Sequence, residues 1–209
     1  LLDLSRVTGP HKPEDVSFTL HRGEVLGLAG LLGSGRSALA RVIAGIDPAI
    51  AGDIRIKGQN MAIRRLSDAI PKGIALVPEA RAIQGIIPAH SVADNMVMSV
   101  IGRIAPRGFV DRARVRAIAD DMITRLSIKT ASRDHAVSTL SGGNQQKVVI
   151  GRWLERDCAV LLFDEPTRGI DVGAKFDIYG LLAELTRQGK ALLVVSSDLR
   201  ELMLICDRI

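Results

Sequence analysis

Residues 30–37 of this 209-residue chain have the types and spacing that phosphate binding requires. The run reads Gly-Leu-Leu-Gly-Ser-Gly-Arg-Ser, follows an apolar segment and precedes a helical pattern. Its glycines allow backbone N–H groups to turn inward around a phosphate, and a helix N-terminus adds about half a positive charge. The spacing is that of the phosphate loop, which is Gly, four residues, then Gly-Lys-Ser/Thr. We therefore predict that this loop binds phosphate and that Ser37 ligates Mg²⁺.

Arg36 occupies the position at which the phosphate-loop pattern has lysine. A planar guanidinium keeps the charge, but it is bulkier than an ammonium and delivers that charge differently. We therefore expect a loop of phosphate-binding origin that does not support normal hydrolysis. The alternative interpretation is an ordinary strand–turn–helix junction with spare glycines.

A second cluster ends the apolar run 159–163 in two carboxylates, Asp164 and Glu165. Asp164 would hold a metal ion directly or through water, and Glu165 would polarise an attacking water as a general base. An acidic cap on the next helix would explain the same two residues. The continuation Pro-Thr-Arg-Gly-Ile-Asp over 166–171 favours the functional interpretation.

A third cluster, residues 140–147, reads Leu-Ser-Gly-Gly-Asn-Gln-Gln-Lys. Ser141 is a favourable helix cap, and Gly142 and Gly143 permit close approach of a ligand. A plain helix start would use the same residues, whereas the functional interpretation needs these amides to face a γ-phosphate. We favour the functional interpretation because the string is specific and lies just before the strand that ends in Asp164.

Segments 140–147 and 159–165 resemble the signature and Walker B elements of an ABC transporter nucleotide-binding domain. More narrowly, segments 140–147 and 164–175 resemble the C-terminal ATP-binding half of bacterial sugar importers of the ribose, galactose and xylose type, and the resemblance covers essentially the whole chain. It implies ATP and Mg²⁺ as cofactors, with the signature serving a nucleotide that a partner domain holds, and with Asp171 in contact with that partner. The expected nucleotide-contacting residues are Gly30, Leu31, Leu32, Gly33, Ser34, Gly35, Arg36, Ser37, Ser141, Gly142, Gly143, Asn144 and Gln145.

Two further positions depart from the general pattern of the family. Ser197 stands where a switch histidine is usual, and Glu79 stands where a glutamine usually links the metal to the transmembrane partner. The resemblance thus gives Glu165 and Ser197 as catalytic positions, and Ser37, Asp164 and Glu79 as metal positions. No clear adenine-stacking aromatic precedes the loop; Val7 and His11 lie near that place. These departures put the chain's own Walker site in doubt and leave the signature untouched.

The length and composition fit one ordinary globular domain with a sizeable core, at 47% hydrophobic and 24% charged residues. The net charge is +5, but the basic residues are scattered and aromatics are only 3%, so we expect no nucleic-acid partner. Cys158 and Cys206 lack metal-site spacing, so we expect buried free thiols and a reducing compartment. No apolar run approaches the ~18 residues of a membrane span.

The element pattern indicates an α/β fold. We expect a P-loop NTPase (RecA-like) core with a mainly parallel sheet, a small N-terminal antiparallel part and an inserted helical subdomain. The domain would comprise residues 1–209, with the core at 1–79 and 156–209 and the helical signature subdomain at 80–155. Strands are predicted at 16–20, 24–29, 53–57, 74–77, 158–163 and 191–196, and helices at 35–44, 144–155, 175–188 and 199–206, with helical periods over 91–126.

The function expected from the resemblance is an ATPase that energises sugar uptake from the cytoplasmic face of the cell membrane, as a peripheral domain. Its partners would be a second ABC domain fused N-terminally, transmembrane permease subunits docked near residues 79–95 and, indirectly, a sugar-binding protein. Two alternatives stay open: a soluble ABC ATPase acting on nucleic acid or ribosomes, and a hydrolytically silent nucleotide-binding regulatory domain.

Overall fold

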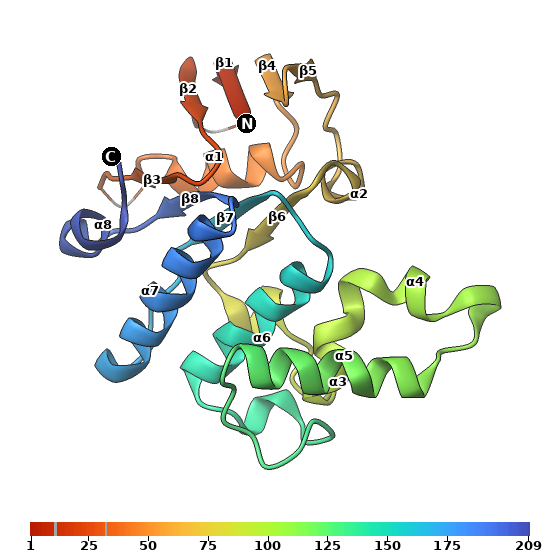
Figure 1. Cartoon of the computed structure of the whole chain (residues 1–209). Coiled ribbons are helices and arrows are strands. Elements are labelled where there is room, and N and C mark those ends of the chain that lie inside the picture. Colours follow the sequence, from red (N-terminus) through yellow and green to blue (C-terminus); the bar gives the residue numbers. More distant parts are fainter. Residues whose placement is uncertain (11, 32) are drawn as a thin grey trace. The chain divides into compact units, whose positions relative to one another are not determined.

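The computed structural model describes residues 1–10, 12–31 and 33–209 (Figure 1). The chain forms two compact units. The first unit comprises residues 1–79, 158–166 and 179–209, and the second comprises residues 80–157 and 167–178. Residues 167–178, which are expected in the core, pack within the second unit.

A four-stranded parallel sheet forms the centre of the first unit, in the order β3-β8-β7-β6. Its strands are β3 (Val25–Leu28), β6 (Ile74–Val77), β7 (Val160–Asp164) and β8 (Ala191–Val195). Strands β6, β7 and β8 are buried throughout, which explains their continuous apolar sequences. Because parallel strands end at one edge, the segments after β3, β6, β7 and β8 meet there. This edge carries the candidate residues of the first unit.

A second, antiparallel sheet has the order β2-β1-β4-β5 and confirms the expected antiparallel part. Its strands are β1 (Leu2–Thr8), β2 (Val16–Leu20), β4 (Ala51–Ile56) and β5 (Gln59–Asn60). The sequence analysis did not predict β1, although this strand pairs with both β2 and β4. A register shift between Leu4 and Val7, where Arg6 has a φ of +52°, interrupts the alternation that would have revealed the strand.

Helices pack on the first unit's parallel sheet and complete its core. Helix α1 (Arg36–Ile43) buries its apolar residues and packs against β7 and β8. The unit also contains α2 (Leu66–Ala69), the 3₁₀ turn η1 (Ile70–Lys72), α8 (Leu199–Ile205) and, from Tyr179 onward, α7 (Val172–Arg187). The parallel core with its predicted helices confirms the α/β P-loop fold.

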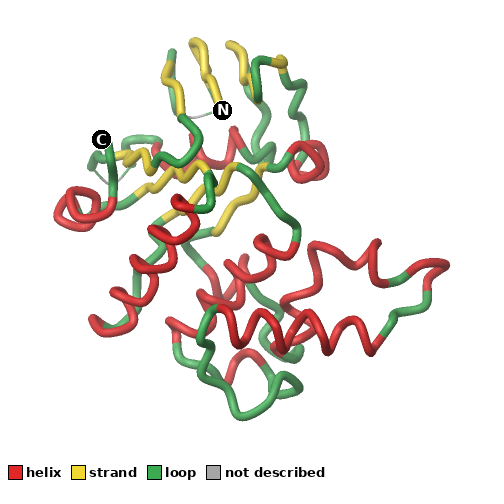
Figure 2. Tube along the Cα trace, in the orientation of Figure 1, coloured by secondary structure: helices red, strands yellow, loops and turns green. Residues whose placement is uncertain are grey.

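The second unit consists of helices and loops (Figure 2). Helix α3 packs against both α5 and α6. The elements are η2 (Arg81–Gly85, π-helical), α3 (Val92–Val97), η3 (Met98–Val100), α4 (Ile101–Ile104), η4 (Pro106–Gly108), α5 (Arg112–Arg125), η5 (Val137–Thr139) and α6 (Gly142–Glu155). Val115, Ile118, Met122 and Leu126 recur at helical spacing; all are buried except Ile118, which is half-buried. No helix within the described residues is long and apolar enough to span a membrane.

Candidate functional site

The phosphate loop connects β3 to α1 in the first unit. Gly33 and Gly35 have φ angles of +80° and +93°, and this left-handed backbone explains why glycine stands at both positions. A Cβ on Gly30 would lie 2.7 Å from Ser34 Oγ, so the loop is also closely packed at its start. The Leu31 side chain is 84% exposed, whereas Leu32 lies outside the described residues.

Arg36 does not point a free guanidinium into the loop. Its Nη1 donates a hydrogen bond to the backbone carbonyl of Ser196, directly after β8. A second cation, Lys12, donates from Nζ to the Gly33 carbonyl at 3.3 Å. The sequence analysis did not single out Lys12, because it belongs to no motif and reaches the loop only through the fold.

Ser37 and Asp164 lie together, as the two motifs predict. Ser37 Oγ donates to Asp164 Oδ1 at 2.8 Å, and Asp164 is 6% exposed. Burial raises the pKa of Asp164, and the Ser37 hydrogen bond opposes this rise. A hydroxyl and a carboxylate oxygen are ligands that suit Mg²⁺, which usually keeps further waters and phosphate oxygens. The donor set therefore fits a magnesium ion.

Glu165 and Ser197 are also brought together at this edge. Ser197 Oγ donates to Glu165 Oε2 at 3.2 Å, and the Glu165 amide donates to the Val195 carbonyl at 2.9 Å. Glu165 has a φ of +48°, a conformation that non-glycine residues adopt chiefly where the surrounding structure enforces it. Glu79 follows β6 at the same edge and is half-buried.

The signature turn lies in the second unit, where α6 begins at Gly142. Ser141 takes the N-cap position, but its side chain accepts no backbone N–H and so does not cap the helix as expected. Ser141 Oγ instead accepts from Asn144 Nδ2 at 2.9 Å. Asn144 Oδ1 accepts from the Lys129 amide at 2.9 Å, and Gln145 Nε2 donates to the Leu140 carbonyl at 3.0 Å. These amide side chains hold the turn in place.

Gly142 and Gly143 pack closely against the segment 167–178. A Cβ on Gly142 would lie 3.3 Å from the Gly169 carbonyl, and a Cβ on Gly143 would lie 2.7 Å from Ala174 Cβ. The sequence analysis explained both glycines by approach of a ligand. The structure adds an internal reason, because a side chain at either position would displace this segment.

Val7 is one of the two residues near the place where an adenine-stacking aromatic was sought. It is fully buried in β1 and offers no stacking surface. His11, the other residue near that place, lies outside the described residues. Cys158 is a buried free thiol as expected, whereas the free thiol Cys206 is only half-buried.

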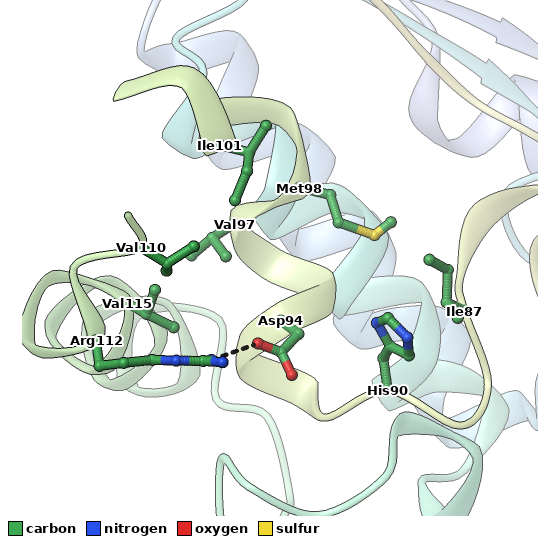
Figure 3. A pocket seen from close by; sticks show the side chains of 9 residues that line it. All are labelled: Ile87, His90, Asp94, Val97, Met98, Ile101, Val110, Arg112 and Val115. Atoms are coloured by element: carbon green, nitrogen blue, oxygen red, sulfur yellow. Dashed lines mark hydrogen bonds and ion pairs between the residues drawn. The ribbon is translucent and has the colours of Figure 1, made fainter. Parts of the chain in front are cut away.

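A pocket of about 370 Å³ is present in the second unit (Figure 3). Its lining is mostly apolar and comes from the loop before α3, from the helical segments α3, η3 and α4, and from the start of α5 with the residue Val110 before it. Asp94 and Arg112 form an ion pair on one side of it, with 3.3 Å between Oδ1 and Nη1. The lining residues are Ile87, His90, Asp94, Val97, Met98, Ile101, Val110, Arg112 and Val115.

The parallel core, the phosphate loop and the adjoining carboxylates define an ATP-binding cassette. Residues 13–168 match the family model described as ABC transporter, and the chain belongs to this family. Three curated relatives illustrate the similarity. The chain is 45% identical over 201 residues to an uncharacterized ABC transporter ATP-binding protein, YphE, of Escherichia coli K12, covering 95% of this chain. It is 46% identical over 194 residues to a putative ribose/galactose/methyl galactoside import ATP-binding protein of Pseudomonas fluorescens, covering 93% of this chain. It is 44% identical over 209 residues to the arabinose import ATP-binding protein AraG of Rhizobium meliloti, covering 100% of this chain.

The chain spans only 40%, 38% and 41% of the lengths of these three relatives. Solved structures show the same fold. A dimeric post-hydrolysis state of the ATP-binding cassette MJ0796 with ADP and Pi is 25% identical, with a TM-score of 0.78, and the match covers 96% of this chain and 90% of that one. A nucleotide-free ATP-binding cassette from an ABC transporter is 21% identical, with a TM-score of 0.82, covering 99% and 85%.

Proposed function

We propose that this chain is the ATP-binding domain of a sugar importer and that its signature turn completes the ATP site of a second ABC domain. The relatives from Pseudomonas fluorescens and Rhizobium meliloti are named as import ATP-binding proteins for sugars, and this chain matches 38% and 41% of their lengths. That share leaves room for a second cassette in the complete protein, with this chain as the C-terminal one.

The observation that carries the proposal is the contrast between the two candidate sites. The guanidinium of Arg36 is engaged by the Ser196 carbonyl, and Ser197 offers only a hydroxyl to Glu165. The signature turn, in contrast, is held by hydrogen bonds of its amide side chains and by close packing on segment 167–178. A weak loop with an intact signature is the arrangement of a domain that serves a partner's nucleotide.

The residues of the first unit nevertheless retain the geometry to hold Mg-ATP. Ser37 and Asp164 would ligate Mg²⁺, and the metal supplies neutralisation of the phosphate charge. Glu165 would accept a proton from the attacking water, with its carboxylate oriented by the Ser197 hydroxyl. A serine cannot carry positive charge as a histidine can, so we propose that hydrolysis at this loop is impaired.

The pocket of the second unit supports docking of a membrane subunit. It has an apolar lining and one ion pair, and it includes residues of the 79–95 region. An apolar anchor with polar groups at its margin fits the pattern of protein interfaces. We propose that permease subunits contact this region and thereby hold the domain at the cytoplasmic face of the membrane.

A second candidate function is a nucleotide-binding domain that does not hydrolyse at all. The engagement of Arg36 by Ser196 favours it over an ordinary ATPase. The two functions differ in one respect: in the importer, the signature of this chain is required for hydrolysis elsewhere in the complete protein.

The test compares Ser141→Glu with Glu165→Gln in the complete protein, reconstituted with its membrane subunits. Ser141 is exposed, and acidic residues are favourable at a helix N-terminus, so Ser141→Glu should fold normally while placing a carboxylate against the partner's γ-phosphate. The carboxylate would repel that phosphate and block its approach to the backbone amides of the turn, and loss of one such transition-state donor costs about 10²–10³ in rate. We expect Ser141→Glu to abolish nearly all phosphate release.

Glu165→Gln should leave a substantial fraction of the activity, because it removes a base only from the weak site. Ser141→Ala is the matched control and should retain most activity, since the Ser141 side chain makes no capping bond. Equal loss in Ser141→Glu and Glu165→Gln would show that this domain hydrolyses ATP itself. If Ser141→Glu remained active, the signature turn of this chain would not be required for ATP hydrolysis.

A further inference from the structure

Arg81 joins three segments of the second unit that are distant in the sequence. It begins the π-helical turn η2, two residues after Glu79 in the chain. Its side chain reaches the segment 167–171, which precedes α7, and it also lies over the first glycine of the signature turn. No motif in the sequence assigns a role to this residue.

The contacts of the guanidinium are specific. Nη1 donates to the Arg168 carbonyl at 2.8 Å, and Nη2 donates to the Gly169 carbonyl at 3.3 Å. Both acceptors are successive backbone carbonyls, so the planar fork fixes the direction of this part of the chain. Arg81 is half-buried, and burial lowers the pKa of its guanidinium. Within the described residues, its buried Nε has no hydrogen-bond partner.

The Arg81 guanidinium packs closely against Gly142. A Cβ at Gly142 would collide with Arg81 Nη2 and would lie 3.3 Å from the Gly169 carbonyl. The signature turn, Arg81 and the Gly169 carbonyl are therefore in mutual contact. Asp171 continues the same segment, and its Oδ1 accepts from the Ala174 amide at 3.0 Å at the start of α7.

We propose that Arg81 is a positioning residue that fixes the segment 168–171 against the signature turn, so that both are presented to the partner domain as one rigid surface. This inference rests on the proposed function, in which the signature turn completes a partner's ATP site. Lysine could not replace Arg81, because a single ammonium cannot donate along two fixed directions to two successive carbonyls.

The experiment measures hydrogen exchange and steady-state kinetics of the complete protein carrying Arg81→Ala or Arg81→Lys. Hydrogen bonds from a charged donor are stronger than neutral ones. Loss of both Arg81 hydrogen bonds should therefore speed hydrogen exchange of the backbone amides in residues 166–172 by about tenfold. We expect kcat for ATP to fall by about tenfold or more in both variants, with KM within about twofold, because Arg81 orients the signature without contacting the partner's phosphate loop.

Arg133→Ala is the matched control. Arg133 also lies in the second unit, donates two hydrogen bonds at 2.6 Å and has a buried Nε without a partner in the described part of the chain. Its partner is the Asp120 carboxylate, away from the signature turn in sequence, so exchange in 166–172 and kcat should stay within about twofold of the unmodified protein.

A double-mutant cycle tests the contact with Gly142 directly. Gly142→Ala should speed exchange of 166–172 strongly when Arg81 is present and much less in the Arg81→Ala background, because the collision requires the guanidinium. Unchanged exchange in Arg81→Ala, full rescue by Arg81→Lys, or additive effects in the cycle would each overturn the proposal. The exchange data remain decisive if Ser141→Glu proves active, so failure of the proposed function is distinguishable from failure of this inference.

Discussion

Arg36 and Lys12 both bring positive charge to the phosphate loop, but a backbone carbonyl engages each of them. Arg36 must therefore break its hydrogen bond to the Ser196 carbonyl before its guanidinium can bind phosphate. A hydrogen bond from a charged donor contributes about 1.5–3 kcal/mol, so this competition is large enough to weaken nucleotide binding.

Arg36→Lys should strengthen binding of Mg-ATP by about tenfold, because a shorter side chain with a compact ammonium is better placed for phosphate than for Ser196. Calorimetric titration of the chain measures this change. Arg36→Ala is the control and should weaken binding, since the loop then loses its own charge. If Arg36→Lys binds Mg-ATP no more tightly than the unmodified chain, then the Arg36–Ser196 hydrogen bond does not weaken nucleotide binding.

Cys206 offers a pH-dependent test at the same scale. The pKa of this thiol is raised to about 12. Burial is the largest cause, and the negative charges of Asp207 and Glu201 add to it. The thiolate fraction should therefore grow about tenfold per pH unit up to that value, whereas an ordinary thiol of pKa about 8.5 levels off above pH 9. The rate of carbamidomethylation at Cys206, followed by mass spectrometry in a Cys158→Ser background, should keep rising between pH 8 and 10. A plateau near pH 9 would contradict the shifted pKa.

Among the elements, the loop before α3 depends on one buried amide. Asn95 is fully buried, accepts from the Ile87 amide at 2.9 Å and donates to the carbonyls of Ile87 and Ser91 at 3.1 and 3.0 Å. The backbone carbonyl of Asn95 accepts a hydrogen bond from Arg152 Nε at 2.8 Å. Burial lowers the pKa of Arg152 to about 10, which shows how far this network is removed from water.

Asn95→Ala should lower the free energy of unfolding by about 2–4 kcal/mol, because the part-buried Ile87 amide loses its partner and the carbonyls of Ile87 and Ser91 each lose one donor. Urea denaturation measures the change. Asn60→Ala is the control: Asn60 is exposed, and within the described residues its side chain bonds Asp53 alone, so its loss should stay within about 0.5 kcal/mol. Similar losses in the two variants would show that the Asn95 network does not stabilise the unit.

The elements with regular periods could be predicted from the sequence, and those with local irregularities could not. Buried apolar runs predicted β6, β7 and β8 because both faces of a parallel sheet are covered. Strand β1 was missed because its bulge at Arg6 breaks the alternation of side chains. The π-helical turn at 81–85 was also missed, since one turn leaves no period to detect.

The candidate site shows the same division. The motifs gave Ser37 and Asp164 as metal positions, and the two lie in contact because a phosphate loop and an acidic strand end share one edge of a parallel sheet. Spacing alone could not predict that Arg36 bonds Ser196, that Lys12 reaches Gly33 or that Arg81 seats on Gly142. Those contacts depend on long side chains whose direction only the folded structure fixes.

At the scale of the whole molecule, the proposed function gives the chain two half-sites of unequal quality. The half-site of the first unit has Ser37, Asp164 and Glu165 in place but lacks a free lysine at the loop. The half-site of the second unit is a signature turn held by internal hydrogen bonds and close glycine packing. Neither is a complete ATPase site under the proposed function, because each needs a partner domain.

The isolated 209-residue chain should therefore bind Mg-nucleotide weakly and show little or no steady-state ATPase activity. Its loop lacks a free ammonium, Ser197 supplies no charge to Glu165, and no partner signature faces the nucleotide. Ordinary enzymes turn over at about 1–10³ s⁻¹, so phosphate release near that range would contradict the proposal. Adding the second ABC domain as a separate polypeptide should raise phosphate release, and Ser141→Glu in this chain should remove that gain, because the recovered activity would use this chain's signature at the partner's loop.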